Sequence, residues 1–228
     1  MLVTYFGHSA LQIELNSVIV LVDPFITGNG LAEKVVSADD LNPDVLLLTH
    51  AHGDHWGDAP AIIKRAKPLV VANHEIVTYV GRELEYNKSH GMNSGGKYDF
   101  AWGTLHQTRA EHSSSFPDGT YGGHPNGFIL EAEGKTVYLM GDTAPFAEMA
   151  WIGEDHNIDV AFMPIGDNFT MGPAGSLRAA RMLRPGITVP VHYNTFPVIE
   201  VDTDGWARDM KSAGFEARVL APGETLDV

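Results

Sequence analysis

The sequence contains no cysteine and little positive charge. The absence of cysteine from its 228 residues excludes disulfides and thiolate metal ligands, and it suits a cytoplasmic protein. Lysine and arginine number 15 against 29 aspartates and glutamates, so the formal net charge is −14. Because such a surface repels polyanions and no Lys/Arg cluster offers a track for phosphates, we expect no nucleic acid polymer as a partner.

Long apolar runs are also absent. None reaches the roughly 18–20 residues that a bilayer-spanning helix needs, and the N-terminus lacks the basic start and apolar core of a signal peptide. We therefore expect a cytoplasmic protein without a membrane partner. A hydrophobic content of 44% is ordinary for a globular protein, and the length suits one large α/β domain over residues 1–228. No residue specifies an oligomer, so a homo-oligomer remains an open alternative.

The densest chemistry in the chain lies in one short segment, His50-Ala51-His52-Gly53-Asp54-His55, which follows an apolar run. Imidazole and carboxylate groups are good ligands for zinc and neighbouring transition metals. Residues two apart in an extended segment point to the same side, so His50 and His52 can reach one ion. Asp54 and His55 lie beyond the turn and can reach a second point. One loop cannot complete either site, so the motif predicts further ligands downstream.

Three downstream residues meet this expectation. His112, Asp142 and His192 each come shortly after an apolar or β-branched run, and Asp23 ends another such run before Pro24. Loops at strand ends commonly carry the chemistry of an α/β scaffold.

Hydrophobic periodicity predicts a strand-rich chain with intervening helices. The predicted strands are 2–5, 10–15, 18–22, 44–49, 69–72, 104–110, 127–133, 136–140, 160–164, 188–191 and 217–220, with a short strand at the C-terminus. The predicted helices are 58–66, 75–86, 145–155, 176–183 and 204–213. Residues 87–97 are rich in Gly, Ser and Asn and predict a loop. Two weak halves, near 1–134 and 135–228, have no linker between them.

The ordered set Asp23, HxHxDH, His112, Asp142 and His192 resembles the five motifs of the metallo-β-lactamase superfamily of dinuclear metal hydrolases. The segments 5–10, 54–59 and 164–172 resemble a branch of metal-dependent hydrolases related more distantly to ascorbate-6-phosphate lactonase. The resemblance runs from about residue 2 to residue 224. It implies an α/β fold, an αββα sandwich of two mixed β-sheets flanked by helices. It does not supply a substrate.

The resemblance also implies roles for the ligands. His50, His52 and His112 would hold one divalent ion, Asp54, His55 and His192 would hold a second, and Asp142 would bridge them. Two ions about 3.5–4 Å apart can share a hydroxide and lower its pKa, which makes that hydroxide the expected nucleophile. Asp54 would also orient the hydroxide. Zinc is the expected metal, although manganese, nickel or iron also suit these N/O ligands.

Several residues have two interpretations. Asp23 would fix a ligand loop by hydrogen bonding or serve only as a turn residue, and Asp142 could merely cap a helix. His8 could donate a proton to a leaving group or be a buried, hydrogen-bonded histidine.

The candidate substrate-binding residues are Asn168, Phe169, Tyr193 and Asn194, although residues 166–172 could instead cap the following helix. Gly175 stands where the branch often has an acidic residue, so the specificity of relatives cannot be transferred. The remaining histidines lack ligand spacing and are predicted to be surface or packing residues: His74, His90, His106, His124 and His156.

These observations predict a dinuclear metal hydrolase that cleaves an ester-type bond, a lactone or carboxylic ester, in a small molecule. One alternative is a phosphodiesterase acting on a small molecule or cyclic nucleotide, with the metals themselves binding the phosphate. Another is a non-catalytic metal-binding or sensing protein. The HxHxDH motif lacks the Glu of oxygen-reducing di-iron relatives, which favours hydrolysis over redox chemistry.

Overall fold

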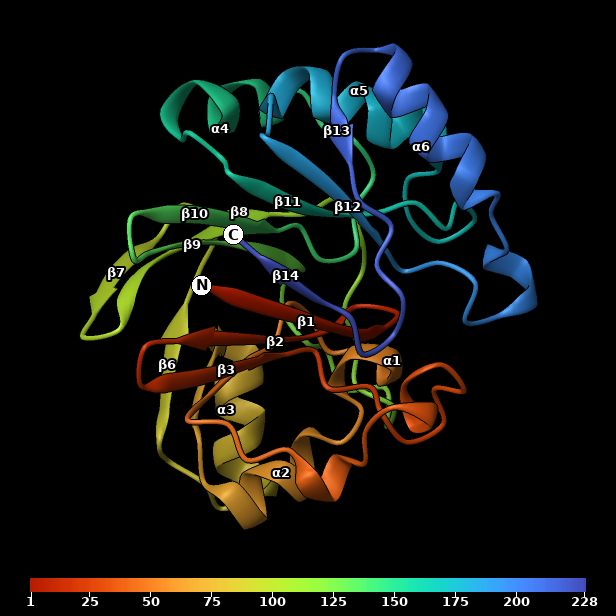
Figure 1. Ribbon diagram of the computed structural model, residues 1–228. Coiled ribbons are helices and arrows are strands. Elements are labelled where there is room, and N and C mark those ends of the chain that lie inside the picture. Colours follow the sequence, from red (N-terminus) through yellow and green to blue (C-terminus); the bar gives the residue numbers. More distant parts are fainter.

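The computed structural model describes residues 1–228 and consists of two β-sheets packed face to face (Figure 1). The first sheet has the order β14-β1-β2-β3-β4-β5-β6. Strands β1 to β3 form an antiparallel meander, and β3 to β6 run parallel. The bounds of its strands are β1 Leu2–Gly7, β2 Ala10–Leu15, β3 Val18–Val22, β4 Val45–Leu47, β5 Leu69–Asn73, β6 Ser89–Met92 and β14 Thr225–Asp227.

The second sheet repeats this plan with the order β13-β12-β11-β10-β9-β8-β7. Strands β7 to β10 are antiparallel, and β10 to β13 run parallel. The bounds are β7 Lys97–Phe100, β8 Gly103–Arg109, β9 Asn126–Ala132, β10 Lys135–Leu139, β11 Val160–Pro164, β12 Ile187–Val191 and β13 Glu216–Ala217.

Helices cover the outer face of each sheet (Figure 1). Those of the first sheet are α1 Gly53–Trp56, α2 Ala59–Ala66 and α3 His74–Glu83, and those of the second are α4 Met149–Asp155, α5 Pro173–Leu183 and α6 Thr203–Ser212. Three 3-10 helices complete the fold: η1 Ala32–Lys34, η2 Ala38–Asp40 and η3 Pro197–Ile199. Asn73 caps α3 by accepting a hydrogen bond from the Ile76 amide at 2.9 Å. None of these helices is long and apolar enough to span a bilayer.

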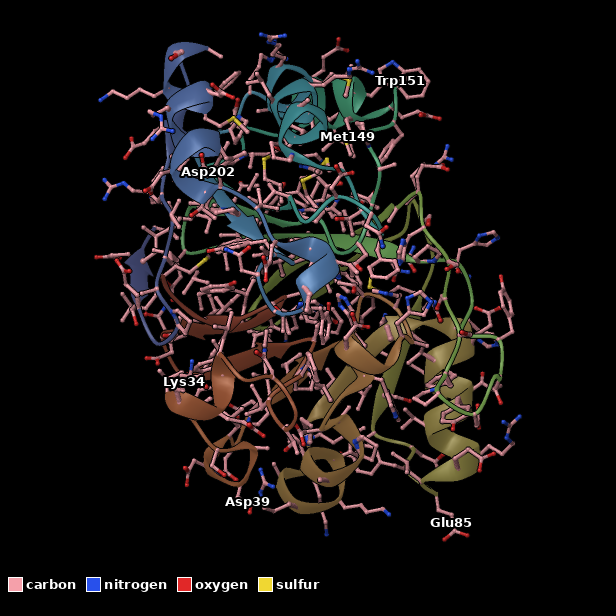
Figure 2. All side chains as sticks on the ribbon, turned by 90° about the vertical axis from the view of Figure 1, so that its right-hand side faces the viewer. Lys34, Asp39, Glu85, Met149, Trp151 and Asp202 are labelled. Carbon is pink, nitrogen blue, oxygen red and sulfur yellow. The ribbon has the colours of Figure 1, made fainter.

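Apolar side chains fill the space between the sheets and the space beneath the helices (Figure 2). One cluster of 39 buried residues joins the inner faces of both sheets to helices of the second sheet, and another of 18 lies between the first sheet and its helices. Helical periodicity is clear in α4, where Met149 is fully buried and Trp151, two residues on, is 65% exposed. Two sheets with outer helices confirm the predicted αββα sandwich.

The loop predicted over residues 87–97 is wrong. This segment contains β6 and the first residue of β7, the two edge strands at the same side of the sandwich. Edge strands bury few side chains, and in β7 three of the four residues are exposed, so the hydrophobic alternation that reveals a strand is missing. The chain also passes from the first sheet to the second within residues 93–96, and not near residue 134.

Several other boundaries also differ from the prediction, among them the start of α5, which is Pro173 and not residue 176. The helix predicted from residue 145 begins only at Met149, because Ala144 pairs with Glu111 in an isolated β-bridge. The helix predicted over 75–86 ends at Glu83. The strand predicted over 217–220 is replaced by the two-residue β13, since only Glu216 and Ala217 pair with β12.

Candidate metal centre

All the candidate ligands leave their strands at one end of the sandwich. Strands β1, β3 and β4 run in the same direction, because β1 and β3 are both antiparallel to β2 and β4 is parallel to β3. In the second sheet β8, β10 and β12 likewise share one direction. Ligand sites in α/β folds form where the carboxyl ends of strands gather. The segments that follow these six strands contain His8, Asp23, the HxHxDH motif, His112, Asp142 and His192.

One group of ligands consists of His50, His52 and His112. His52 Nδ1 lies 3.1 Å from His50 Nε2 and 3.2 Å from His112 Nε2. Three imidazole nitrogens so close together can surround one ion. Thr49 Oγ1 lies 3.1 Å from the other nitrogen of His50, Nδ1, and thus orients the ring.

A second group contains Asp54, His55 and His192, with His8 beside them, and their ligand atoms all lie within 4.8 Å of one another. His192 Nε2 lies 3.6 Å from Asp54 Oδ2. His8 Nε2 lies 3.1 Å from the same oxygen, and His8 Nδ1 lies 2.9 Å from Thr195 Oγ1.

The Asp142 carboxylate lies between the two groups. Its Oδ2 atom is 3.6 Å from His112 Nε2 and 2.9 Å from His192 Nε2. Its Oδ1 atom is 3.2 Å from His55 Nε2. One carboxylate therefore reaches imidazoles of both groups, which is the position that a bridging ligand requires.

Asp23 fixes the HxHxDH segment by hydrogen bonds to residues at both of its ends. Its carboxylate accepts hydrogen bonds from the Thr49 amide at 2.8 Å and from Thr49 Oγ1 at 2.6 Å. Its Oδ2 atom also lies 2.8 Å from His55 Nδ1. A proton fixed on Nδ1 leaves Nε2 of His55 as the free metal-binding atom.

The strand ends turn sharply to present these side chains. His8, Asp23 and His192 have positive φ angles of 56°, 42° and 54°, a conformation that non-glycine residues seldom adopt. Such strained residues gather at functional sites. Gly141, before Asp142, has a φ of 63°, and a Cβ atom there would lie 2.6 Å from the Asn126 carbonyl oxygen. Only glycine fits this close approach to the start of β9.

Burial and charge decide the protonation of the cluster. Burial lowers the pKa of His50 well below its ordinary value and that of His8 to about 4, and neighbouring histidines add to both shifts. Burial opposes ionisation of Asp142, but the imidazoles of His192 and His55 outweigh it and hold the pKa of that carboxyl well below its usual range. Burial likewise lowers the pKa of His192, yet Asp142 outweighs it and raises the pKa to about 9.

These residues fit a metal centre. His55 Nε2 and Asp142 Oδ1 are buried without a hydrogen-bond partner, although buried polar atoms are nearly always satisfied. The buried carboxylates attract positive charge, which protons on His55 and His192 supply in the absence of ions. A cation would replace those protons. The cluster opens to solvent at Asp54, His52 and His112, which are only partly buried, whereas the side chains of the other ligands are at most 2% exposed: His50, His55, Asp142 and His192.

The four predicted substrate-binding residues differ in their burial and in their contacts. Asn168 and Phe169 are exposed in the loop before α5. Tyr193 is buried and stacks on Tyr5 with ring centroids 6.5 Å apart. Asn194 Oδ1 accepts a hydrogen bond from the Val201 amide at 2.7 Å, so this side chain holds its own loop.

Sequence reasoning missed two hydroxyls, Thr49 and Thr195. Their hydrogen bonds to His50, Asp23 and His8 make them partners of the candidate ligands. Thr49 directly precedes the HxHxDH motif, which was the available signal. Of the histidines predicted to be surface or packing residues, His106 in β8 and His156 at the end of α4 lie close to Glu131 in β9.

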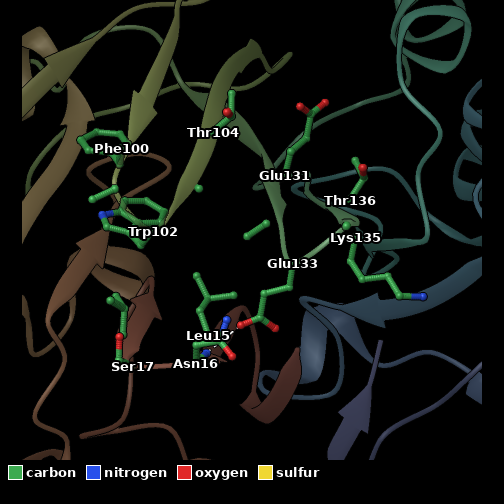
Figure 3. Close-up of a pocket in the computed structure, with 15 residues that line it drawn as sticks. Leu15, Asn16, Ser17, Phe100, Trp102, Thr104, Glu131, Glu133, Lys135 and Thr136 are labelled. Carbon is green, nitrogen blue, oxygen red and sulfur yellow. Dashed lines mark hydrogen bonds between the residues drawn. The ribbon is translucent and has the colours of Figure 1, made fainter.

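A cavity of about 900 Å³ lies at the opposite end of the sandwich (Figure 3). It is lined by the β2–β3 and β9–β10 turns, from which β3 and β10 run towards the metal cluster. Asn16, Trp102 and Glu133 border it (Figure 3). Because it is separated from the cluster by the length of these strands, it is not the entrance to the candidate metal centre.

Two mixed seven-stranded sheets with a His/Asp cluster at the carboxyl ends of their strands define a metallo-β-lactamase fold. Residues 19–193 match the family described as Beta-lactamase superfamily domain. UPF0173 metal-dependent hydrolases of Salinibacter ruber and Thermus thermophilus are each 47% identical to the chain. The first match covers 97% of both sequences, and the second covers 98% of this chain and 97% of the relative.

The structure is also similar to that of Igni18, a metallo hydrolase from the archaeon Ignicoccus hospitalis. The two share 39% sequence identity over 99% of this chain and 97% of the other, with a TM-score of 0.88. The chain belongs to the UPF0173 metal-dependent hydrolases of the beta-lactamase superfamily.

Proposed function

We propose that residues 1–228 form one hydrolase domain that holds two divalent ions and cleaves an ester-type bond, a lactone or carboxylic ester, in a small molecule. The observation that supports it best is the convergence of two ligand groups on the single carboxylate of Asp142, with Oδ2 at 2.9 Å from His192 Nε2 and 3.6 Å from His112 Nε2. A sensing protein would need neither two adjacent ligand groups nor a shared carboxylate.

In this proposal His50, His52 and His112 hold one ion, and Asp54, His55 and His192 hold the other. Zinc is the first choice, and manganese, nickel and iron also suit the nitrogen and oxygen donors. When bound, the ions would activate a shared water and polarise the bond to be cleaved. Asp23 keeps His55 in the tautomer whose Nε2 atom is free to bind.

Asp54, like His52 and His112, is only partly buried, so it is placed to orient the attacking water as well as to bind metal. His8 stands directly behind it. Because the Asp54 carboxylate only accepts hydrogen bonds, His8 Nε2 must donate to it, and Nδ1 must accept from Thr195. The proton-donor role predicted for His8 would therefore act through Asp54, which separates His8 from solvent.

A carbonyl substrate is favoured over a phosphodiester. The side chains that hydrogen-bond to His8 and to the candidate ligands, those of Asp23, Thr49, Ser113 and Thr195, supply no positive charge to clamp a phosphate. Asn168, Phe169, Tyr193 and Asn194 remain our candidates for substrate contact. A cytoplasmic location and a possible homo-oligomer belong to the same proposal.

The test is hydrolysis by protein reconstituted separately with zinc, manganese and nickel. Each form is assayed against a lactone panel and a phosphodiester panel, with Asp54→Ala as the background and bound metal counted by mass spectrometry. We expect lactone hydrolysis that the variant loses. Activity on phosphodiesters alone would overturn the choice of bond and favour the phosphodiesterase. Two bound ions with no turnover on either panel would favour a non-catalytic protein.

A further inference from the structure

The outer face of the second sheet contains a second cluster of metal-binding side chains, away from the candidate metal centre. We propose that His106, Glu131 and His156 form a mononuclear site for zinc or a neighbouring transition-metal ion. Their ligand atoms, one from each residue, all lie within 4.8 Å of one another. This inference does not depend on the proposed hydrolysis.

Strand register brings the first two residues together. In the β8–β9 pair His106 lies opposite Ile129 and Thr104 lies opposite Glu131. Because residues two apart point to the same face, His106 and Glu131 are diagonal neighbours on one face of the sheet. That face is the one covered by helices, since one cavity is lined both by His106 and Ile129 and by Trp151 and Ile152 of α4.

His156 approaches from the helix above. It is the residue at the C-terminal cap of α4. Its Nδ1 atom lies 2.9 Å from Glu131 Oε1, and His106 Nε2 lies 3.5 Å from Glu131 Oε2. The two imidazole rings are nearly perpendicular, at an interplanar angle of 78°, with centroids 4.7 Å apart. Tetrahedral zinc with bonds of about 2.0–2.1 Å sets neighbouring ligand atoms roughly 3.3 Å apart, so the observed spacing is close to that of a bound site.

One atom of the cluster is unsatisfied. His106 Nε2 is buried and has no hydrogen-bond partner, although Glu131 Oε2 lies 3.5 Å away. A buried nitrogen that faces a carboxylate and a second imidazole, yet makes no hydrogen bond, is accounted for by a metal ion between them.

The donor set indicates the class of ion. Two imidazoles and one carboxylate exclude calcium and magnesium, which prefer oxygen ligands, and favour zinc or a neighbouring transition metal. Three protein ligands leave a fourth position open. That position has access to solvent through a cavity of about 390 Å³ lined by His106, Trp151, Asp155 and His156. The carboxylate of Asp155 adds negative charge to this cavity.

Binding would fasten the end of α4 to the sheet. Two ligands belong to neighbouring strands and the third ends the helix, so one ion would link three elements. The side chains of His106, Glu131 and His156 are only 22%, 39% and 15% exposed, which limits competition from water. The predicted consequence is a fold that is more resistant to heat when this site is filled.

The experiment counts zinc in the full chain and in three variants after dialysis against one buffered zinc solution. Glu131→Gln and His156→Gln keep the side-chain size but remove a ligand. His124→Gln is the matched control, since His124 is exposed and outside the cluster. We expect each ligand variant to bind one zinc ion fewer per chain than the wild type, and the control to bind as many. Because the result is a difference, it is independent of occupancy at the candidate metal centre.

A second measurement distinguishes the loss of the site from misfolding of a variant. Thermal unfolding of the metal-free proteins identifies which variants fold, and the rise in Tm on adding zinc is then compared among them. We expect a smaller rise in the ligand variants than in the wild type and the control. Equal zinc content and an equal rise in Tm in folded ligand variants would overturn the site, and the cluster would then be a hydrogen-bonded network alone.

Discussion

Replacing Asp23 by Asn should weaken metal binding without touching a metal ligand. The buried carboxylate makes three contacts, with the Thr49 amide, Thr49 Oγ1 and His55 Nδ1, at 2.8, 2.6 and 2.8 Å. Asparagine must place an NH₂ group at one of the two oxygen positions. An NH₂ group at the Oδ1 position would face the Thr49 N–H, and two donors cannot form a hydrogen bond. At the Oδ2 position it donates to His55 Nδ1, which moves the proton of His55 to Nε2 and removes the lone pair that would bind metal.

The contacts of Asp23 allow the loss of stability and the loss of metal affinity to be estimated. A buried donor left without an acceptor costs about 1–3 kcal/mol, and hydrogen bonds to a charged group exceed neutral ones by roughly 1–1.5 kcal/mol. We therefore expect the metal-free Asp23→Asn protein to lose about 2–4 kcal/mol of unfolding free energy. Loss of a group that orients a ligand weakens metal binding by about 10–100-fold, equivalent to about 1.4–2.7 kcal/mol.

Zinc affinity is measured by competition with a chromophoric chelator, and stability by denaturant unfolding of the metal-free protein. Asp44→Asn is the control, because Asp44 Oδ2 accepts the Ile19 amide at 2.9 Å at the far end of β3. The control should keep its zinc affinity. An Asp23→Asn protein that binds zinc within about twofold of the wild type would refute the argument that Asp23 fixes the His55 tautomer.

Three further predictions concern the same end of the sandwich. Gly141→Ala should lose about 1–3 kcal/mol in denaturant unfolding, because of its positive φ and the Asn126 carbonyl; unchanged stability would contradict this strain. Asp142→Ala should reduce metal content below two ions per chain by mass spectrometry, and an unaltered count of two would exclude bridging. His8→Ala should keep its metal but turn over substrate about 100-fold more slowly if His8 supplies a proton, whereas an equal rate would leave it a packing residue.

Much of the candidate site could be predicted because its residues follow apolar strands. His50, Asp142 and His192 each come one to three residues after a strand whose side chains are mostly buried, so the sequence marks both the strand and its end. The edge strands β6 and β7 could not be found in this way, since most of their side chains are not buried.

Groups that act through a hydrogen bond are harder to find from the sequence. Thr195 touches His8 although 187 positions separate them, and no motif marks either the distance or the contact. The cluster of His106, Glu131 and His156 could not be predicted from the sequence for a related reason. Glu131 is 25 positions from each of the two histidines, and only the β8–β9 register and the packing of α4 bring the three residues together.

The candidate metal centre is also the place where the two sheets are joined. The His192 amide of the second sheet donates to the His8 carbonyl of the first at 2.8 Å, and the Asn126 amide donates to the Thr49 carbonyl at 3.0 Å. Ligands from both sheets thus face one another across this joint, and their buried carboxylates need positive charge. Asp142 raises the pKa of the His55 and His192 imidazoles against the effect of burial, which favours their protonated forms while no cation is bound.

Metal binding would therefore exchange protons for ions at the joint, and it would release protons as it occurs. The same carboxylates that bind metal also keep the metal-free sheets together by pairing with imidazolium groups. Removing Asp142 would take away both a metal ligand and the partner of the imidazolium groups. Removing the metal alone would leave the carboxylate–imidazolium pairs.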